Sequence, residues 1–188
     1  NKIVFSLSDS NLQRIALENS ESSLLKPGDP MDYSKVNDEI NRLINIYQNN
    51  GYYKISREEI FVEADSSYKE LIDPSIDQFE YLRRLAEIEQ KYKNNPQGDV
   101  YIRQRSLKDT TRVVPYRVGN VIVYSDAPSD FTLASRDTTQ TEINGYRIIS
   151  FNNTFRPTFI IKYIDLKPGE LYKLEDYSQT LNNFNRLG

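Results

Sequence analysis

Two periodicities of apolar residues alternate along the chain, one typical of short strands and the other of amphipathic helices. An alternating run over residues 2–7 predicts a first strand. Apolar residues spaced by three and four then predict two helices, which end near residues 19 and 50. A second alternating run predicts a strand over residues 58–65. The first part of the chain therefore combines strands and helices in one unit.

The rest of the chain continues this pattern with polar interruptions. Asp73-Pro74 begins a predicted helix that ends near residue 94, where Asn, Pro and Gly residues stop it. Asn144-Gly145 is a tight-turn signal at the end of a polar stretch over residues 127–145. The other predicted elements are strands over 100–107, 113–126 and 146–151, and helices over 157–166 and from 174 onward.

A short pattern occurs twice and indicates an internal repeat. Leu-Lys-Pro-Gly stands at residues 25–28 and again at 166–169, each time before an acidic residue, a Tyr, a helical stretch and a closing Gly. Pro fixes φ and Gly accepts positive φ, so we interpret these residues as turns and helix caps; contact with a partner is the alternative. The residues are Pro27, Gly28, Gly51, Pro168, Gly169 and Gly188.

The repeat predicts an α+β chain of two domains, over residues 1–110 and 111–188. Each is expected to be a small mixed three-stranded sheet with two helices on one face, in the order β-α-α-β-β. The first carries a helical insert at about 67–94, and the second stops before its last two strands, so Gly188 is expected to fall inside a domain. We expect the insert to bury its apolar face in its own domain, with docking of a partner as the alternative. That face comprises Ile76, Phe79, Leu82, Leu85, Ile88 and Tyr92.

Composition excludes several classes of function. The 188 residues carry a formal charge of -3, which provides no basic field for nucleic acid. Cys and His are both absent, so disulfides, thiolate chemistry, His metal sites and His-based triads are excluded. No apolar run approaches the roughly 20 residues that span a bilayer.

Catalysis is not expected either. The conceivable carboxylate pairs lack the spacing of a metal loop, and solvated surface groups are the simpler interpretation. We therefore predict no catalytic, cofactor-binding or metal-binding residues. A carboxylate-based hydrolase or sugar-binding enzyme remains the alternative from another class. The pairs are Asp126 with Asp130, Asp32 with Asp38, and Glu58 with Glu59.

The two strand–helix–helix series with Pro-Gly between their helices resemble POTRA domains, the polypeptide-transport-associated modules. The resemblance is strongest to outer-membrane barrel-assembly and translocation-assembly proteins (the surface antigen family). It covers most of the chain and departs from the family in the insert, the longer 127–145 segment and the missing last strands. The matching residues are 25–53 and 60–65 in the first unit, and 116–121, 167–172 and 180–188 in the second.

The resemblance implies a non-catalytic periplasmic scaffold at the outer membrane, in a parent protein anchored by a C-terminal β-barrel. Its implied partners are unfolded outer-membrane protein segments and accessory assembly proteins, with no cofactor and no nucleic acid. The second strand is implied to lie at a sheet edge, where clients add by β-augmentation; an edge covered by the insert or a neighbouring domain is the alternative. The edge residues are Glu58, Glu59, Ile60, Phe61, Val62, Glu63 and Ala64.

A second hypothesis keeps the domain but changes its role. Modules of this type also serve two-partner secretion transporters and septal proteins, where they bind one specific partner. Alternating strands of about ten residues after Gly188 would indicate the barrel-assembly role.

Overall fold

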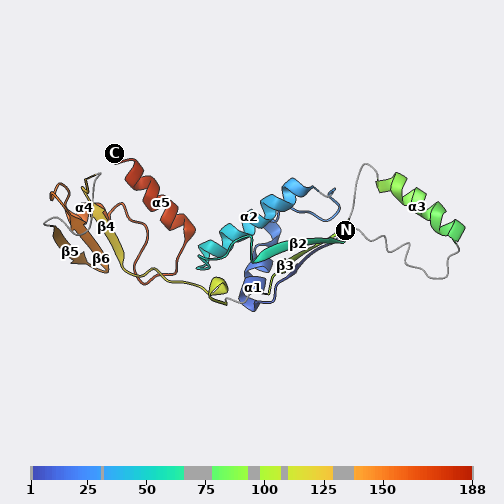
Figure 1. The fold of residues 1–188 in the computed structure, drawn as a ribbon, viewed down its shortest axis with the longest axis horizontal. Helices are drawn as coiled ribbons and strands as arrows, with labels where there is room; N and C mark the ends of the chain where they lie inside the picture. Colours follow the sequence, from blue (N-terminus) through green and yellow to red (C-terminus); the bar gives the residue numbers. More distant parts are fainter. Residues whose placement is uncertain are drawn as a thin grey trace. The chain divides into compact units, whose positions relative to one another are not determined.

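The computed structural model describes residues 2–30, 32–65, 78–92, 98–106, 110–128 and 138–187. The chain divides into two compact units, one of residues 1–44 and 56–108 and the other of residues 45–55 and 109–188. Each contains a small mixed three-stranded sheet, which confirms the α+β class (Figure 1). The division differs from the expected 1–110 and 111–188 because residues 45–55 group with the second unit.

The first unit has the predicted strand–helix–helix–strand–strand order, with an added helix before the last strand. Its sheet has the order β1-β3-β2, with β1 parallel and β2 antiparallel to β3. The predicted insert is described only over its helix, since residues 66–77 and 93–97 lie outside the described part. The elements are β1 (Ile3–Ser6), α1 (Ser10–Glu18), η1 (Ser20–Ser22), α2 (Tyr33–Asn49), β2 (Ile60–Asp65), α3 (Gln78–Tyr92) and β3 (Asp99–Gln104). The last turn of α2, from residue 45 onward, groups with the second unit.

Local signals explain why these elements form. Asp9 caps α1 as predicted, because its Oδ1 accepts hydrogen bonds from the backbone N–H groups of Asn11 (2.9 Å) and Leu12 (3.0 Å). The chain leaves α2 at Gly51, whose φ of 92° is the left-handed conformation predicted for it. The apolar residues that recur at helical spacing in α1 and α2 are all buried, which confirms the predicted periodicity: Leu12, Ile15, Ala16, Val36, Ile40, Leu43, Ile44 and Tyr47.

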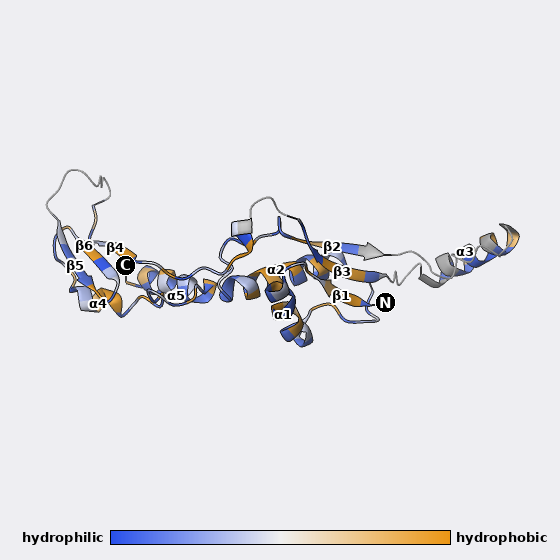
Figure 2. Ribbon diagram, turned by 90° about the horizontal axis from the view of Figure 1, so that it is seen from below, coloured by the Kyte–Doolittle hydropathy of each residue, from blue (hydrophilic) through white to orange (hydrophobic). Residues whose placement is uncertain are grey.

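The sheet of the first unit has one buried and one open face. Ile60, Val100 and Ile102 are buried and share a face, whereas the alternate positions of β2 and β3 remain partly exposed. Apolar residues gather where α1 and α2 meet the strands (Figure 2). Phe79 and Leu82 of α3 are 79% and 55% exposed, so the predicted burial of the insert is wrong for these two side chains.

The second unit has a different element order from the first. Its sheet has the order β4-β6-β5, and all three strands precede the two helices, whereas the repeat predicted one strand, an insert and then the helices. The difference arises because residues 139–150 form a hairpin at Asn144-Gly145 that pairs with β4. The elements are η3 (Thr110–Val113), β4 (Val121–Ser125), β5 (Thr139–Ile143), β6 (Tyr146–Ser150), α4 (Pro157–Ile161) and α5 (Leu174–Asn185).

Two boundaries and one buried face in the second unit differ from the sequence predictions. The strand predicted over 113–126 begins only at Val121, because Val118 N–H and Tyr116 C=O bond instead to Glu170 and Tyr172. Helix α4 is short because the N–H groups of residues 165 and 166 donate to the Thr180 hydroxyl. Thr180 is the buried residue of α5, whereas the predicted inward residues Tyr177, Leu181 and Leu187 are exposed.

Candidate functional site

The strand β2 lies at an edge of the first sheet, where the sequence placed the candidate site. Arg105 N–H donates to Glu59 C=O at 2.8 Å, and backbone groups alternate in direction along an antiparallel strand. The N–H and C=O groups of Ile60, Val62 and Ala64 therefore point away from β3. Among the described residues, no strand pairs with β2 on that side. Within the described residues, β2 is therefore an unpaired strand edge.

The opposite edge of the same sheet, at β1, is capped at its C-terminal end by one side chain. Val100 N–H donates to Lys2 C=O, so Phe5 and Leu7 direct their backbone groups outward. Gln13 of α1 bonds to both, since Leu7 N–H donates to its Oε1 (2.9 Å) and its Nε2 donates to Phe5 C=O (2.8 Å). The amide of Gln13 thus replaces a neighbouring strand. Sequence reasoning missed this residue, whose only signal is a Gln early in the helix that follows the strand.

Two of the predicted edge residues lie in the turn before β2 and not in the strand. The strand begins at Ile60 rather than at residue 58, so Glu58 and Glu59 lie in the turn. Glu59 is fully buried, and its carboxylate accepts hydrogen bonds from Ser56 N–H (2.6 Å) and Ser56 Oγ (2.8 Å). These bonds form the turn, which is why the predicted strand starts late. Glu59 is therefore an internal anchor, not a surface charge.

The open face beside β2 combines aromatic rings with guanidinium groups. Arg105 Cζ lies 5.0 Å from the ring centroid of Phe61, and Arg103 Cζ lies 5.2 Å from that of Tyr101. Arg103 Nε also lies 2.8 Å from Glu63 Oε2, an ion pair whose N–H is not aligned for a hydrogen bond. Phe61 and Glu63 thus share the open face, while Ile60 and Val62 face the core.

Of the carboxylates considered as catalytic pairs, Asp32, Glu59 and Asp126 have structural roles. Asp32 accepts a hydrogen bond from Ser34 N–H at 2.8 Å, and Asp130 lies outside the described residues. Glu39 is fully buried; burial raises its pKa, but hydrogen bonds from Arg42 and from Leu24 N–H outweigh that effect and lower it. In the described ranges, no group of three or more acidic side chains is placed to hold a metal ion.

Asp126 organises the end of the sheet in the second unit. Its carboxylate accepts hydrogen bonds from the backbone N–H groups of Phe151 (2.8 Å), Asn152 (3.1 Å) and Thr154 (2.9 Å), and from Ser150 Oγ. Burial raises the pKa of Asp126, but the bonds from Thr154 and Phe151 outweigh it and lower the pKa to about 2. The group is an ionised structural anchor at neutral pH.

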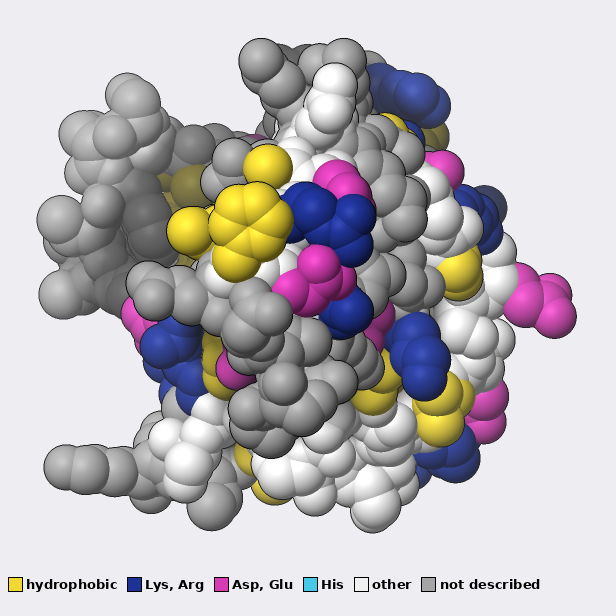
Figure 3. All heavy atoms as spheres, turned by 90° about the vertical axis from the view of Figure 1, so that its right-hand side faces the viewer, with side chains coloured by type: hydrophobic (Ala, Val, Ile, Leu, Met, Phe, Trp, Pro, Cys, Tyr) yellow, Lys and Arg dark blue, Asp and Glu magenta, His cyan; other side chains and the backbone are white. Residues whose placement is uncertain are grey.

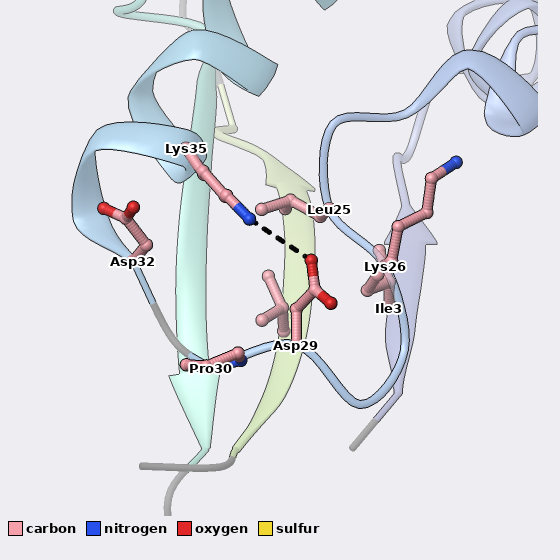
Figure 4. A pocket seen from close by; sticks show the side chains of 8 residues that line it. Ile3, Leu25, Lys26, Asp29, Pro30, Asp32 and Lys35 are labelled. Carbon is pink, nitrogen blue, oxygen red and sulfur yellow. Dashed lines mark hydrogen bonds and ion pairs between the residues drawn. The ribbon is translucent and has the colours of Figure 1, made fainter. Parts of the chain in front are cut away.

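Two cavities were not predicted from the sequence. A cavity of about 530 Å³ in the second unit lies beside β4 and is lined mainly by Val123, Phe155, Phe159, Phe184 and Leu187. The spacing of the two phenylalanines around Pro157 is its only sequence signal. In the first unit, Lys35 Nζ and Asp29 Oδ2 pair at 3.3 Å across a far smaller cavity of about 20 Å³, room for about one water (Figure 4).

Charge distribution and helix composition of the described residues bear on nucleic-acid binding and on membrane spanning. Figure 3 shows basic and acidic side chains interspersed on one face, so the described atoms there form no continuous basic patch. Within the described ranges, none of the helices combines the length and apolarity that crossing a bilayer requires. Comparison of the chain with models of protein families and with curated proteins gives no match.

Proposed function

We propose that this chain is a non-catalytic scaffold whose first unit receives extended segments of unfolded polypeptide at the edge of β2. The observation that carries the proposal is the contrast between the two edges of one sheet, since Gln13 caps the end of β1 while Ile60, Val62 and Ala64 keep outward backbone groups. Backbone hydrogen bonding depends little on sequence, which suits a module that handles many clients.

The wider role follows from the resemblance to POTRA domains. On this proposal the clients are segments of outer-membrane proteins, accessory assembly proteins are further partners, and the scaffold lies in the periplasm at the outer membrane. Strands of such barrels alternate apolar and polar residues. That pattern fits β2, where Ile60 and Val62 continue the buried face and Phe61 and Glu63 the open one. No cofactor or nucleotide enters, because the client's own folding supplies the free energy.

Two alternatives predict different behaviour. A module of a two-partner secretion or septal protein would use the same edge for one specific partner, so unrelated extended peptides would not compete. A carboxylate-based hydrolase would need converging free carboxylates. Among the described residues, Glu39, Glu59 and Asp126 are instead occupied by Arg42, Ser56 and the 150–154 loop. This occupancy favours binding over hydrolysis.

Backbone-methylated peptides test the proposal without altering the protein. A ten-residue peptide of alternating Val and Thr, with Lys at both ends, would be N-methylated either on the Val or on the Thr residues. In the bound peptide, only the Val residues or only the Thr residues direct their N–H groups toward β2. Methylation of those residues should abolish binding, whereas methylation of the others should preserve it. Equal affinities of the two peptides, or no binding by the unmodified one, would contradict the proposal. Fluorescence anisotropy of labelled peptides gives the affinities.

A further inference from the structure

The sheet geometry determines which client side chains would meet the open face. A strand added antiparallel to β2 places the residues opposite Phe61 and Glu63 on that face, with Cβ atoms about 4.5–5.5 Å from those of β2. The residues between them lie on the face of Ile60 and Val62. A bound client therefore alternates between an apolar environment and the environment of the open face.

The two open-face positions differ in charge. At Glu63 the charge is already neutralised, because Arg103 Nε lies 2.8 Å from Glu63 Oε2. At Phe61 the guanidinium of Arg105 lies over the ring at 5.0 Å and is exposed. It forms no ion pair with any residue that the structure describes. The site opposite Phe61 thus offers an apolar ring beneath an available cation.

We infer that the preferred client segment carries an Asp or Glu side chain opposite Phe61, with apolar residues on the alternate positions. A carboxylate there accepts hydrogen bonds from the guanidinium of Arg105, which lies over the ring of Phe61. This inference rests on the proposed binding at β2 and adds a sequence preference to it. Exposed charge pairs of this kind alter affinity about two- to fivefold.

The test compares three peptides of alternating Val and Thr in which one central Thr is replaced by Glu, Gln or Lys. A repetitive host slides to its best register, so the comparison needs no prior alignment. The proteins are the full chain, Arg105→Gln, Arg105→Glu and, as the matched control, Arg14→Gln. Arg14 is an exposed arginine of α1 paired with Glu18 at 2.7 Å. Anisotropy gives affinities at low and high salt, and amide shifts of Ile60 and Val62 report where each peptide binds.

The expected result is that the Glu peptide binds the full chain about two- to fivefold more tightly than the Gln peptide, less so at high salt. The preference should vanish in Arg105→Gln, persist in Arg14→Gln and turn toward the Lys peptide in Arg105→Glu. Equal binding of all three peptides with shifts at Ile60 and Val62 overturns the acidic preference and leaves the proposed function standing. If Arg14→Gln loses the preference for the Glu peptide as fully as Arg105→Gln does, the acidic preference opposite Phe61 is also overturned. The preference would then come from the net charge of the protein and not from Arg105. Unmoved amides with every peptide overturn both.

Discussion

The two edges of the first sheet differ in one side chain. Both β1 and β2 lie beside β3 and both direct backbone groups outward. Gln13 bonds to the Phe5 C=O and the Leu7 N–H at the end of β1, whereas β2 has no such side-chain cap among the described residues. Natural sheets usually protect their edges, because an open edge invites aggregation. The difference between the two edges supports the proposed use of β2, because an edge kept for a partner is left uncapped.

Proline scanning of β2 should give the largest effect. Val62→Pro removes only an outward N–H, so the β2–β3 ladder survives and client binding is lost. Phe61→Pro removes an N–H that faces β3 and should destabilise the first unit by several kcal/mol. Urea unfolding followed by circular dichroism, with peptide anisotropy on the folded variant, separates the two. Tight binding by a folded Val62→Pro protein would refute the edge assignment.

Opening the closed edge is the next test. Gln13→Leu removes two hydrogen bonds to Phe5 and Leu7, which should lower the free energy of unfolding by about 1–3 kcal/mol. Faster hydrogen exchange at the Leu7 amide and new peptide-induced shifts there should accompany it. The neighbouring exposed Arg14→Ala is the control, expected within about 0.5 kcal/mol of the parent chain. Unchanged exchange at Leu7 would show that Gln13 does not close the edge.

A smaller effect is expected from the turn that begins β2. Glu59→Gln keeps the shape but weakens the charge-assisted bonds to Ser56, which should cost about 1–2 kcal/mol of stability. Client affinity should fall modestly, because Ile60 is then held less firmly. The adjacent, exposed Glu58→Gln serves as its match in urea titrations. If both substitutions lower the free energy of unfolding by the same amount, the bonds from Glu59 to Ser56 do not stabilise the turn.

The smallest effect on peptide binding is expected from Asp126 in the second unit, which serves as a control for the comparison of the two sheet edges. The folded-state pKa of Asp126 is about 2, below its ordinary 3.8, so its stabilising contribution is complete above pH 3.8 and is lost as the pH falls through 2. Between pH 7 and pH 4, amide shifts of Phe151 and Thr154 should not change. Asp126→Asn should loosen this loop at neutral pH and leave peptide binding at β2 unaltered. A titration near pH 4 at Phe151, or weaker peptide binding, would contradict this.

The sequence predicted the helices of the first unit well, because their apolar positions recur at helical spacing and each helix has a cap or a closing Gly. It did not predict the roles of Gln13 and Glu59. A polar side chain reads as solvent-exposed unless its hydrogen-bond partners are known, and those partners are backbone groups three to eight residues away. Glu59 in particular resembles any charged strand residue.

The second unit shows the limits of a repeat. The shared Pro-Gly turns are real, with φ of 91° at Gly28 and 84° at Gly169. However, β5 is composed of Thr, Gln, Glu and one Ile, so it lacks the apolar alternation that marks a strand. Only pairing with β6 makes it one. Turn chemistry can be read locally, whereas strand order depends on pairing across the fold.

Amide shifts on titrating an extended, barrel-derived peptide into the full chain test the central claim most directly. The account predicts that the amides of Ile60, Val62 and Ala64 shift in a saturable manner and become protected from exchange, while that of Leu7 does not change. Shifts confined to Leu7, or none at Ile60, Val62 and Ala64 at saturating peptide, would contradict it.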